Sequence, residues 1–130
     1  MTVKTFTIDR SAWSRGTQDS MLLDQRGHRC CLGFYLGACG LSDEELFQES
    51  APTDVHEILP AEARWLIVRA SSDGSTSPFE SVAGGQLISV NDQRDEPVHG
   101  REAEIASIFA ARGIAVTFVD GPTDEKGGSQ

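Results

Sequence analysis

The last third of the sequence limits the fold more than any other part. Residues 101–112 place their large apolar side chains on one stripe, which predicts an amphipathic helix, and Gly113 follows where such a helix commonly ends. Residues 86–90 and 114–119 contain β-branched side chains, and each run predicts a strand. A strand, a helix and a second strand over this length allow a right-handed crossover between two parallel strands.

Earlier segments carry the start and stop signals of further elements. Residues 2–8 alternate polar and apolar side chains and predict an N-terminal strand. Residues 32–40 have large apolar groups at helical spacing, and their glycines predict a buried helix that another element can approach closely. Ser42 and Glu45 are spaced as a capping box and predict the start of a short helix running to about residue 49.

The middle of the chain predicts loops on either side of one further helix. Residues 50–59 predict a loop around Pro52, and Pro60 fits the first position of a helix that continues over residues 61–68. Residues 71–85 are rich in Ser, Gly and Thr and predict a mobile loop.

Together these elements predict an α+β fold in a single compact domain. A chain of 130 residues buries about two-thirds of its unfolded surface, which suffices for one hydrophobic core. We expect residues 1–120 to form a mixed sheet of four or five strands with helices mainly on one face. Residues 121–130 predict a disordered C-terminal tail.

The apolar pattern and the cysteines indicate the compartment. No apolar run reaches the length that crosses a bilayer, and the N-terminus lacks the continuous apolar stretch of a signal peptide. The cysteines (Cys30, Cys31 and Cys39) are odd in number, and two of them are neighbours that do not easily bridge each other, so reduced thiols are expected. The sequence therefore predicts a cytoplasmic protein.

Charge is concentrated in one part of the chain. The net charge is −9, and residues 43–57 contain six acidic side chains and no Lys or Arg. Such a surface repels nucleic acid and anionic membranes, so we expect no direct contact with either, and it suits a partner protein with a basic surface. The candidate protein-binding residues are Asp43, Glu44, Glu45 and Glu49. The alternative is an acidic face that only keeps the protein in solution.

A second candidate site follows residue 90, where a predicted strand ends. Asn91 and Asp92 lie at this point, and strand ends are where open α/β sheets bind ligands. Arg94, Arg101 and His99 are close in sequence and suit a phosphate or carboxylate group, so the segment suggests a nucleotide-like ligand. The alternative is ordinary turn chemistry, in which an Asn-Asp pair caps backbone groups.

The cysteines suggest a third kind of chemistry. Cys31 is expected at the N-terminus of a helix, which favours the thiolate, with His28 or His99 as a base and Asp92 to orient it. The alternative is that Cys30 and Cys31 pack in the core.

Metal binding and cofactor binding find little support in the sequence. The spacing of Cys30, Cys31, Cys39 and His28 does not match zinc sites, so we expect no metal. No glycine-rich phosphate loop or nucleophile elbow is present, and we expect no cofactor.

Several short motifs together resemble a family of small uncharacterised proteins of phages, prophages and their bacterial hosts. Its hallmarks are an early Cys-Cys-Leu-Gly segment and a late Asn-Asp pair, and the resemblance covers roughly residues 3–120. The matching segments are 13–16 (Trp-Ser-Arg-Gly), 22–23 (Leu-Leu), 29–34 (Arg-Cys-Cys-Leu-Gly-Phe), 38–41 (Ala-Cys-Gly-Leu), 89–92 (Ser-Val-Asn-Asp), 101–105 (Arg-Glu-Ala-Glu-Ile) and 113–120 (Gly-Ile-Ala-Val-Thr-Phe-Val-Asp).

The resemblance implies a mobile-element setting, and with it the cytoplasm of the host cell. Small acidic proteins of this setting often bind a host protein as host-takeover or anti-defence factors. The leading hypothesis is therefore a non-enzymatic protein that binds a host protein through its acidic surface. The alternatives are a nucleotide-like ligand bound at residues 91–101 and, third, a cysteine enzyme.

Overall fold

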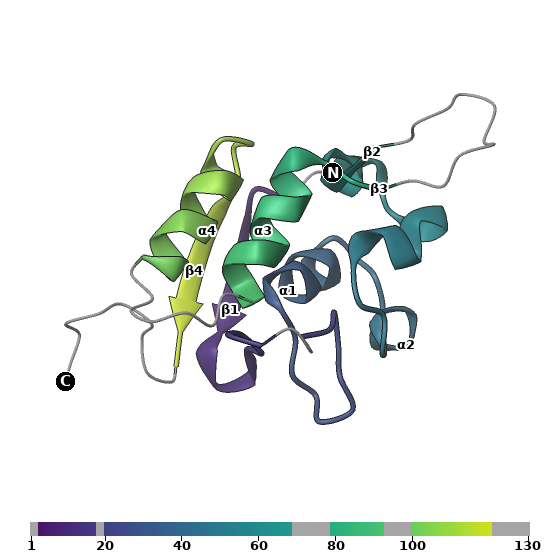
Figure 1. The fold of residues 1–130 in the computed structure, drawn as a ribbon, viewed down its shortest axis with the longest axis horizontal. Helices are drawn as coiled ribbons and strands as arrows, with labels where there is room; N and C mark the ends of the chain where they lie inside the picture. Colours follow the sequence, from purple (N-terminus) through teal and green to yellow (C-terminus); the bar gives the residue numbers. More distant parts are fainter. Residues whose placement is uncertain (1–2, 18–19, 69–78, 93–99, 121–130) are drawn as a thin grey trace.

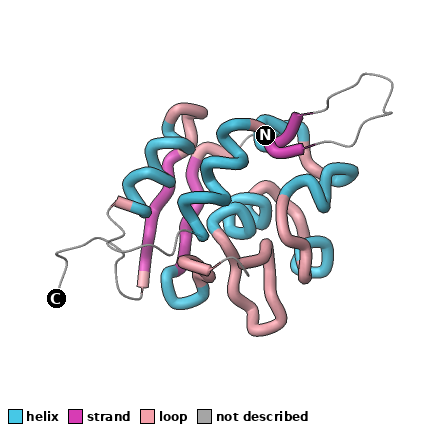
Figure 2. Tube along the Cα trace, in the orientation of Figure 1, coloured by secondary structure: helices cyan, strands magenta, loops and turns pink. Residues whose placement is uncertain are grey.

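The first and last strands of the chain pair with each other. The computed structural model describes residues 3–17, 20–68, 79–92 and 100–120. Strands β1 (Thr5–Asp9) and β4 (Ala115–Val119) run parallel, with Thr5 opposite Ala115 and Asp9 opposite Val119, as Figures 1 and 2 show. The strands predicted at the two ends of the domain are therefore confirmed, with small shifts at their ends.

Helices and two further short strands lie between these strands in the sequence. In chain order they are η1 (Arg10–Ala12), α1 (Cys31–Ala38), α2 (Asp43–Leu46), η2 (Pro52–Ile58), η3 (Ala61–Leu66), β2 (Ile67–Val68), β3 (Phe79–Glu80), α3 (Val82–Asp92) and α4 (Arg101–Ala110), where η marks a 3₁₀ helix.

One face of the β1–β4 pair turns towards the helices. Phe6 and Ile8 are buried, whereas Thr5 and Thr7 between them are exposed, because successive strand residues point to opposite faces. Helix α1 contacts β1 and helix α4 contacts β4, and α3 packs beside α4 (Figure 1). Gly113 has a φ of 77°, a left-handed conformation that ends the α4 segment and turns the chain into β4.

An aromatic cluster joins four elements at the centre of the core. The Phe109 ring of α4 lies 4.9 Å from Phe6 of β1, 5.1 Å from Tyr35 of α1 and 5.5 Å from Trp65 of η3, measured between ring centroids. Aromatic pairs at these distances and inclined angles add to the stabilisation from apolar burial. The cluster therefore holds the sheet and its helices in one hydrophobic core.

The predicted mixed sheet of four or five strands is wrong. The described residues form two separate two-stranded sheets, β1 with β4 in parallel and β2 with β3 in antiparallel orientation. The broader prediction of a fold that mixes helices and strands is confirmed.

The larger predicted sheet does not form, mainly because residues 86–90 are part of helix α3 and not a strand. The Ser81 hydroxyl accepts the Gly84 N–H at 3.0 Å and starts the helix. Gly84, Leu87 and Asn91 are buried at helical spacing. A five-residue apolar run fits either period, so contacts with the rest of the fold decide between helix and strand.

The predicted end of the helix that begins after Ser42 also differs. The capping box of Ser42 and Glu45 is present, but α2 ends at Leu46 because the next residues pair with the segment before α1. The backbone N–H of Leu22 donates to the Glu49 carbonyl at 2.8 Å. Pairing with another segment therefore ends the helix before residue 49.

The segments around Pro60 adopt 3₁₀ structure instead of a loop and an α-helix. Residues 50–59, predicted as a loop, contain η2, and residues 61–68 form η3 followed by β2. Residues 79–85 of the predicted mobile loop belong to β3, to the start of α3 and to the residue between them. The rest of that loop and the predicted tail, residues 121–130, lie outside the described residues.

Two neighbouring glycines of α3 provide a test of this packing. A Cβ at Gly84 would lie 2.3 Å from the Leu66 carbonyl oxygen, whereas a Cβ at Gly85 would have no atom within 4 Å. Gly84→Ala is expected to lower the free energy of unfolding by about 1–3 kcal/mol through overpacking. Gly85→Ala, the control, is expected to raise it by about 0.5–1 kcal/mol through helix propensity. Urea denaturation of both variants measures the difference, and equal effects would contradict the close approach of α3 to η3.

Candidate functional site

The side chain of Asn91, at the end of α3, forms several hydrogen bonds in the interior. Asn91 is 1% exposed. Its Oδ1 accepts hydrogen bonds from Trp13 Nε1 at 2.7 Å and from the backbone N–H of Cys31 at 2.9 Å. Its Nδ2 donates to the Ser14 carbonyl at 3.0 Å. Asn91 therefore links α3 to α1 and to the segment that follows η1.

The bond to Cys31 caps helix α1 from another element. The residue at the N-cap position, Cys30, makes no capping hydrogen bond with its side chain. The first N–H groups of a helix need acceptors outside the helix, and Asn91 supplies one of them. The helix predicted at residues 32–40 is confirmed, but its capping group lies far away in sequence.

Asp92 and Arg101 lie close to Asn91. Asp92 accepts a hydrogen bond from Asn91 Nδ2 at 3.0 Å. Burial raises the pKa of Asp92 above its ordinary value, and hydrogen bonds from Asn91 and Ser20 and the charge of Arg101 oppose that rise. Arg101 begins α4 and is 5% exposed. The structure thus brings together three of the four predicted ligand-binding residues, and Arg94 lies outside the described residues.

The setting of these residues differs from the predicted strand end. Asn91 and Asp92 are the last residues of a helix, and the Asn91 amide is engaged inside the protein. Asn91 therefore serves the structure, while Asp92 and Arg101 stay candidate ligand groups. The fifth residue of the hypothesis, His99, also lies outside the described residues.

An ion pair between two residues far apart in the sequence, which no local pattern predicts, joins η1 to α4. Both guanidinium nitrogens Nε and Nη2 of Arg10 donate to the Glu102 carboxylate at 2.8 Å. Glu102 is 6% exposed, and the pair joins η1 to the first turn of α4. A bidentate arginine–carboxylate pair combines charge attraction with a defined geometry, so it holds η1 and α4 in a fixed relative position.

Replacing Asn91 tests its structural role. Asn91→Ala would leave the buried donors of Trp13 and Cys31 without an acceptor, so it is expected to lower the free energy of unfolding by about 2–4 kcal/mol. Ser89→Ala changes an exposed polar residue of the same helix and is expected to stay within about 0.5 kcal/mol of the original protein. Urea denaturation distinguishes the two, and a similar small effect for both would refute the role.

The positions of the three thiols do not favour nucleophilic catalysis. Cys30 and Cys31 are buried, and Cys39 is partly buried. Burial raises the pKa of Cys30 to about 11 and that of Cys31 well above its ordinary value. Burial raises the pKa of Cys39 to about 11 as well. The helix N-terminus at Cys31 does not outweigh the loss of solvation, so the thiols stay protonated near neutral pH.

Alkylation measures this protection. With iodoacetamide near neutral pH, Cys30 and Cys31 are expected to react at least a hundredfold more slowly in the folded protein than in urea, because the thiolate is the reactive form. Cys39, which is only partly buried, is expected to react faster than either. Mass spectrometry of the alkylated peptides gives the three rates. Rapid labelling of Cys30 or Cys31 in the folded state would restore the cysteine-enzyme hypothesis.

The acidic residues predicted for protein binding lie on or just after α2. Asp43, Glu44 and Glu45 are exposed, and Glu49 is partly exposed. Asp43 accepts a hydrogen bond from Arg29 Nη2 at 2.6 Å, and Glu45 accepts the Ser42 N–H at 2.8 Å within the capping box. Two of the four carboxylates thus have structural partners.

The other two acidic residues face solvent without such partners. Among the described residues, Glu44 and Glu49 make no side-chain hydrogen bond or ion pair. They are therefore the predicted residues best placed to meet a partner.

An apolar side chain that the sequence analysis missed lies among these carboxylates. A surface hollow of about 310 Å³ is lined by Leu23, Asp43, Glu44 and Phe47, and we call it the acidic hollow. Phe47 is 46% exposed. The sequence signal was present, since Phe47 directly follows Leu46, the last apolar residue that the capping pattern turns inward. The exposure of Phe47 was not predicted, because the helix was expected to continue to residue 49.

Other kinds of site are absent from the part of the chain that the structure describes. Nowhere in residues 3–17, 20–68, 79–92 and 100–120 do three His, Cys, Asp or Glu side chains gather as metal ligands would. None of the helices within these ranges has the length and apolar character needed to cross a membrane.

Comparisons with known proteins add no relative. No protein-family model, curated protein or solved structure matches this chain. The resemblance to the phage and prophage family stays a prediction from the sequence motifs.

Proposed function

We propose that this chain is a non-enzymatic binding protein that docks a basic segment of a partner protein into the acidic hollow. The observation that carries the proposal is the exposed ring of Phe47 beside Asp43 and Glu44. An exposed apolar anchor beside carboxylates matches a peptide segment in which an apolar side chain is flanked by Lys or Arg.

The backbone holds Phe47 in this exposed position. Phe47 forms a bridge with Leu23, and the N–H of Gln48 donates to the Leu23 carbonyl at 2.7 Å. Gln48 has a φ of 62°, a left-handed conformation that costs a non-glycine residue about 1–2 kcal/mol. The surrounding hydrogen bonds keep the strained residue in place, so the backbone that carries Phe47 is already ordered before a partner binds.

Charge supports a basic partner. Residues 43–57 contain six carboxylates and no Lys or Arg. Among the residues that the structure describes, the one ion pair of these carboxylates joins Asp43 to Arg29. Opposite charge on a partner would speed association and favour that partner over acidic ones. The buried, protonated thiols agree with a function that needs no nucleophile.

The setting proposed for the partner follows from the sequence motifs. In a phage or mobile-element context the partner is a host protein, and the chain acts as a host-takeover or anti-defence factor in the host cytoplasm. The competing function, a nucleotide-like ligand at residues 91–101, now depends on Asp92 and Arg101, because Asn91 is engaged in the interior.

A random-peptide display library tests the docking proposal with a defined probe. Selected peptides are expected to carry an apolar residue flanked by Lys or Arg. For a synthesised peptide, Phe47→Ala and Glu44→Lys are each expected to weaken binding at least tenfold by calorimetry, about 1.4 kcal/mol. Added salt is expected to weaken binding as well.

The control and the choice of variants follow from the structure. Glu104→Lys makes the same charge change on an exposed position of α4 and is expected to leave the affinity unchanged. Glu45 and Asp43 are left intact, because their carboxylates cap α2 and pair with Arg29. A library without binders, binders without basic residues, or equal effects of Glu44→Lys and Glu104→Lys would each overturn the proposal.

A further inference from the structure

A second cavity is lined by Tyr35 and Trp65 of the aromatic cluster and shares no lining residue with the acidic hollow. It has a volume of about 540 Å³, within the range of small-molecule sites. Its walls come from four places: the start of β1, helix α1, helix η3 and the turn between α4 and β4. These elements pack on the same hydrophobic core, which holds the walls of the cavity in place. The inference drawn from this cavity does not rest on the docking proposal.

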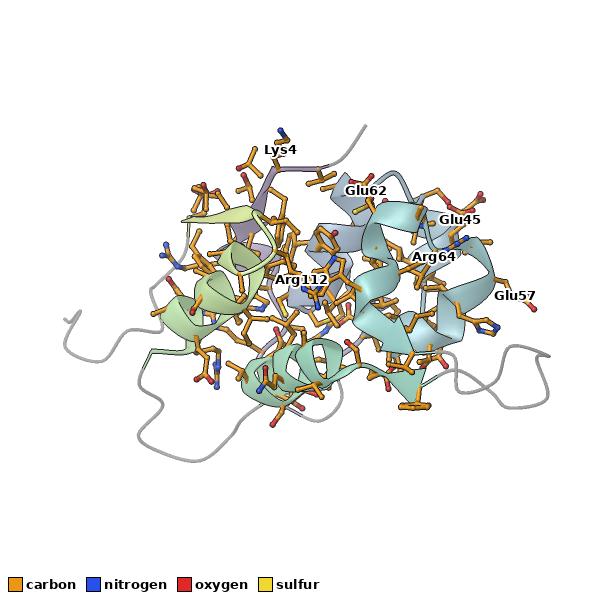
Figure 3. The ribbon with its side chains drawn as sticks, turned by 90° about the horizontal axis from the view of Figure 1, so that it is seen from above. Lys4, Glu45, Glu57, Glu62, Arg64 and Arg112 are labelled. Atoms are coloured by element: carbon orange, nitrogen blue, oxygen red, sulfur yellow. The ribbon has the colours of Figure 1, made fainter. Side chains whose placement is uncertain are left out.

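Two cations line this cavity in a chain of net charge −9. Lys4 and Arg112 are both exposed, and neither forms an ion pair with any described residue. The Arg112 guanidinium lies 5.1 Å from the centre of the Trp65 ring, and this cation–π contact holds it over the cavity wall. Figure 3 shows Arg112 reaching from the end of α4 towards η3, with Lys4 on the β1 side.

One carboxylate accompanies the two cations. Glu62 Oε1 accepts the backbone N–H of Val3, so this side chain is partly engaged in fixing the start of the chain. With Lys4 and Arg112 the cavity carries one positive charge in excess. A ligand with a single negative charge balances that excess. A phosphate monoester, which carries about −1.5 to −2 charges near neutral pH, would place surplus charge beside Glu62.

The remaining wall includes Tyr35 and Trp65, whose polar groups form hydrogen bonds within the protein. The Tyr35 hydroxyl donates to the Glu62 carbonyl at 3.2 Å and accepts from Trp65 Nε1 at 3.0 Å. Burial raises the pKa of Tyr35, which keeps the hydroxyl protonated and able to donate. Tyr35 and Ile114 are buried behind this wall, so the half-buried ring of Trp65 is the aromatic surface that the cavity offers to a flat ligand body.

We propose that this cavity binds a small aromatic carboxylate, whose ring lies against Trp65 and whose carboxylate meets Arg112 and Lys4. The guanidinium group of arginine pairs well with carboxylates, since its planar donors match the two oxygens. Arg64 and Glu57 line a different hollow of the surface and lie outside this cavity.

Nuclear magnetic resonance of the indole N–H groups tests the proposal. The chain has two tryptophans, Trp13 and Trp65, and Trp65→Phe assigns their signals. Indole-3-carboxylate at millimolar concentration is expected to shift the Trp65 signal and leave the Trp13 signal in place. The neutral analogue indole-3-carboxamide is expected to bind at least tenfold more weakly, because it lacks the charge.

Variants on the surface identify the groups that bind the carboxylate. Arg112→Gln and Lys4→Gln are each expected to weaken binding by at least tenfold, and both residues are exposed, so the fold should persist. Arg64→Gln, an exposed arginine of η3 outside this cavity, is the control and is expected to change nothing.

Three results would overturn the proposal. They are an unmoved Trp65 signal, equal binding of the carboxamide, and tighter binding of phenyl phosphate than of the carboxylate. None of them bears on the peptide experiment, which concerns residues of α2 and the segment after it.

Discussion

The arrangement of the helices depends on one buried amide group. Asn91 accepts hydrogen bonds from Trp13 Nε1 and from the Cys31 N–H, and it donates to the Ser14 carbonyl. In an interior of low dielectric constant such bonds are strong when complete and costly when one partner is missing. The position of α3 is therefore coupled to the start of α1 and to the chain that leaves η1. Because η1 directly follows β1, the same group orients the helices relative to the sheet.

Close backbone approach makes this coupling possible. A Cβ at Gly33 would lie 1.9 Å from the Leu22 carbonyl oxygen, and one at Gly84 would lie 2.3 Å from that of Leu66. Helix α1 is thus pressed against the segment before it, and α3 against η3. The glycine of the Cys-Cys-Leu-Gly segment has a physical explanation in this contact, and the two cysteines before it fill the core.

Local signals in the sequence were sufficient for some elements and not for others. The capping box at Ser42, the glycine turn at Gly113 and the strands at both ends act within a few residues, and the sequence predicted them. Residues 86–90 form a short apolar run with no decisive period, and the close contact of Gly84 with η3 is a tertiary interaction. The composition of residues 43–57 was enough to identify the acidic residues. The exposure of Phe47 was not predicted, because it depends on the pairing with Leu23 that ends α2 early.

The two proposed surfaces can act independently because charge in water is short-ranged. Glu45 and Glu57 lie on the right of the view in Figure 3, whereas Lys4 and Arg112 lie nearer its middle. Salt at physiological concentration screens exposed charges beyond about 8 Å, so each surface presents its own local charge and not the net charge of −9. An overall acidic chain can therefore attract a basic segment at α2 and hold an anion near Arg112. The apolar core between them supplies the fixed geometry, and the charges beside each surface decide what it selects.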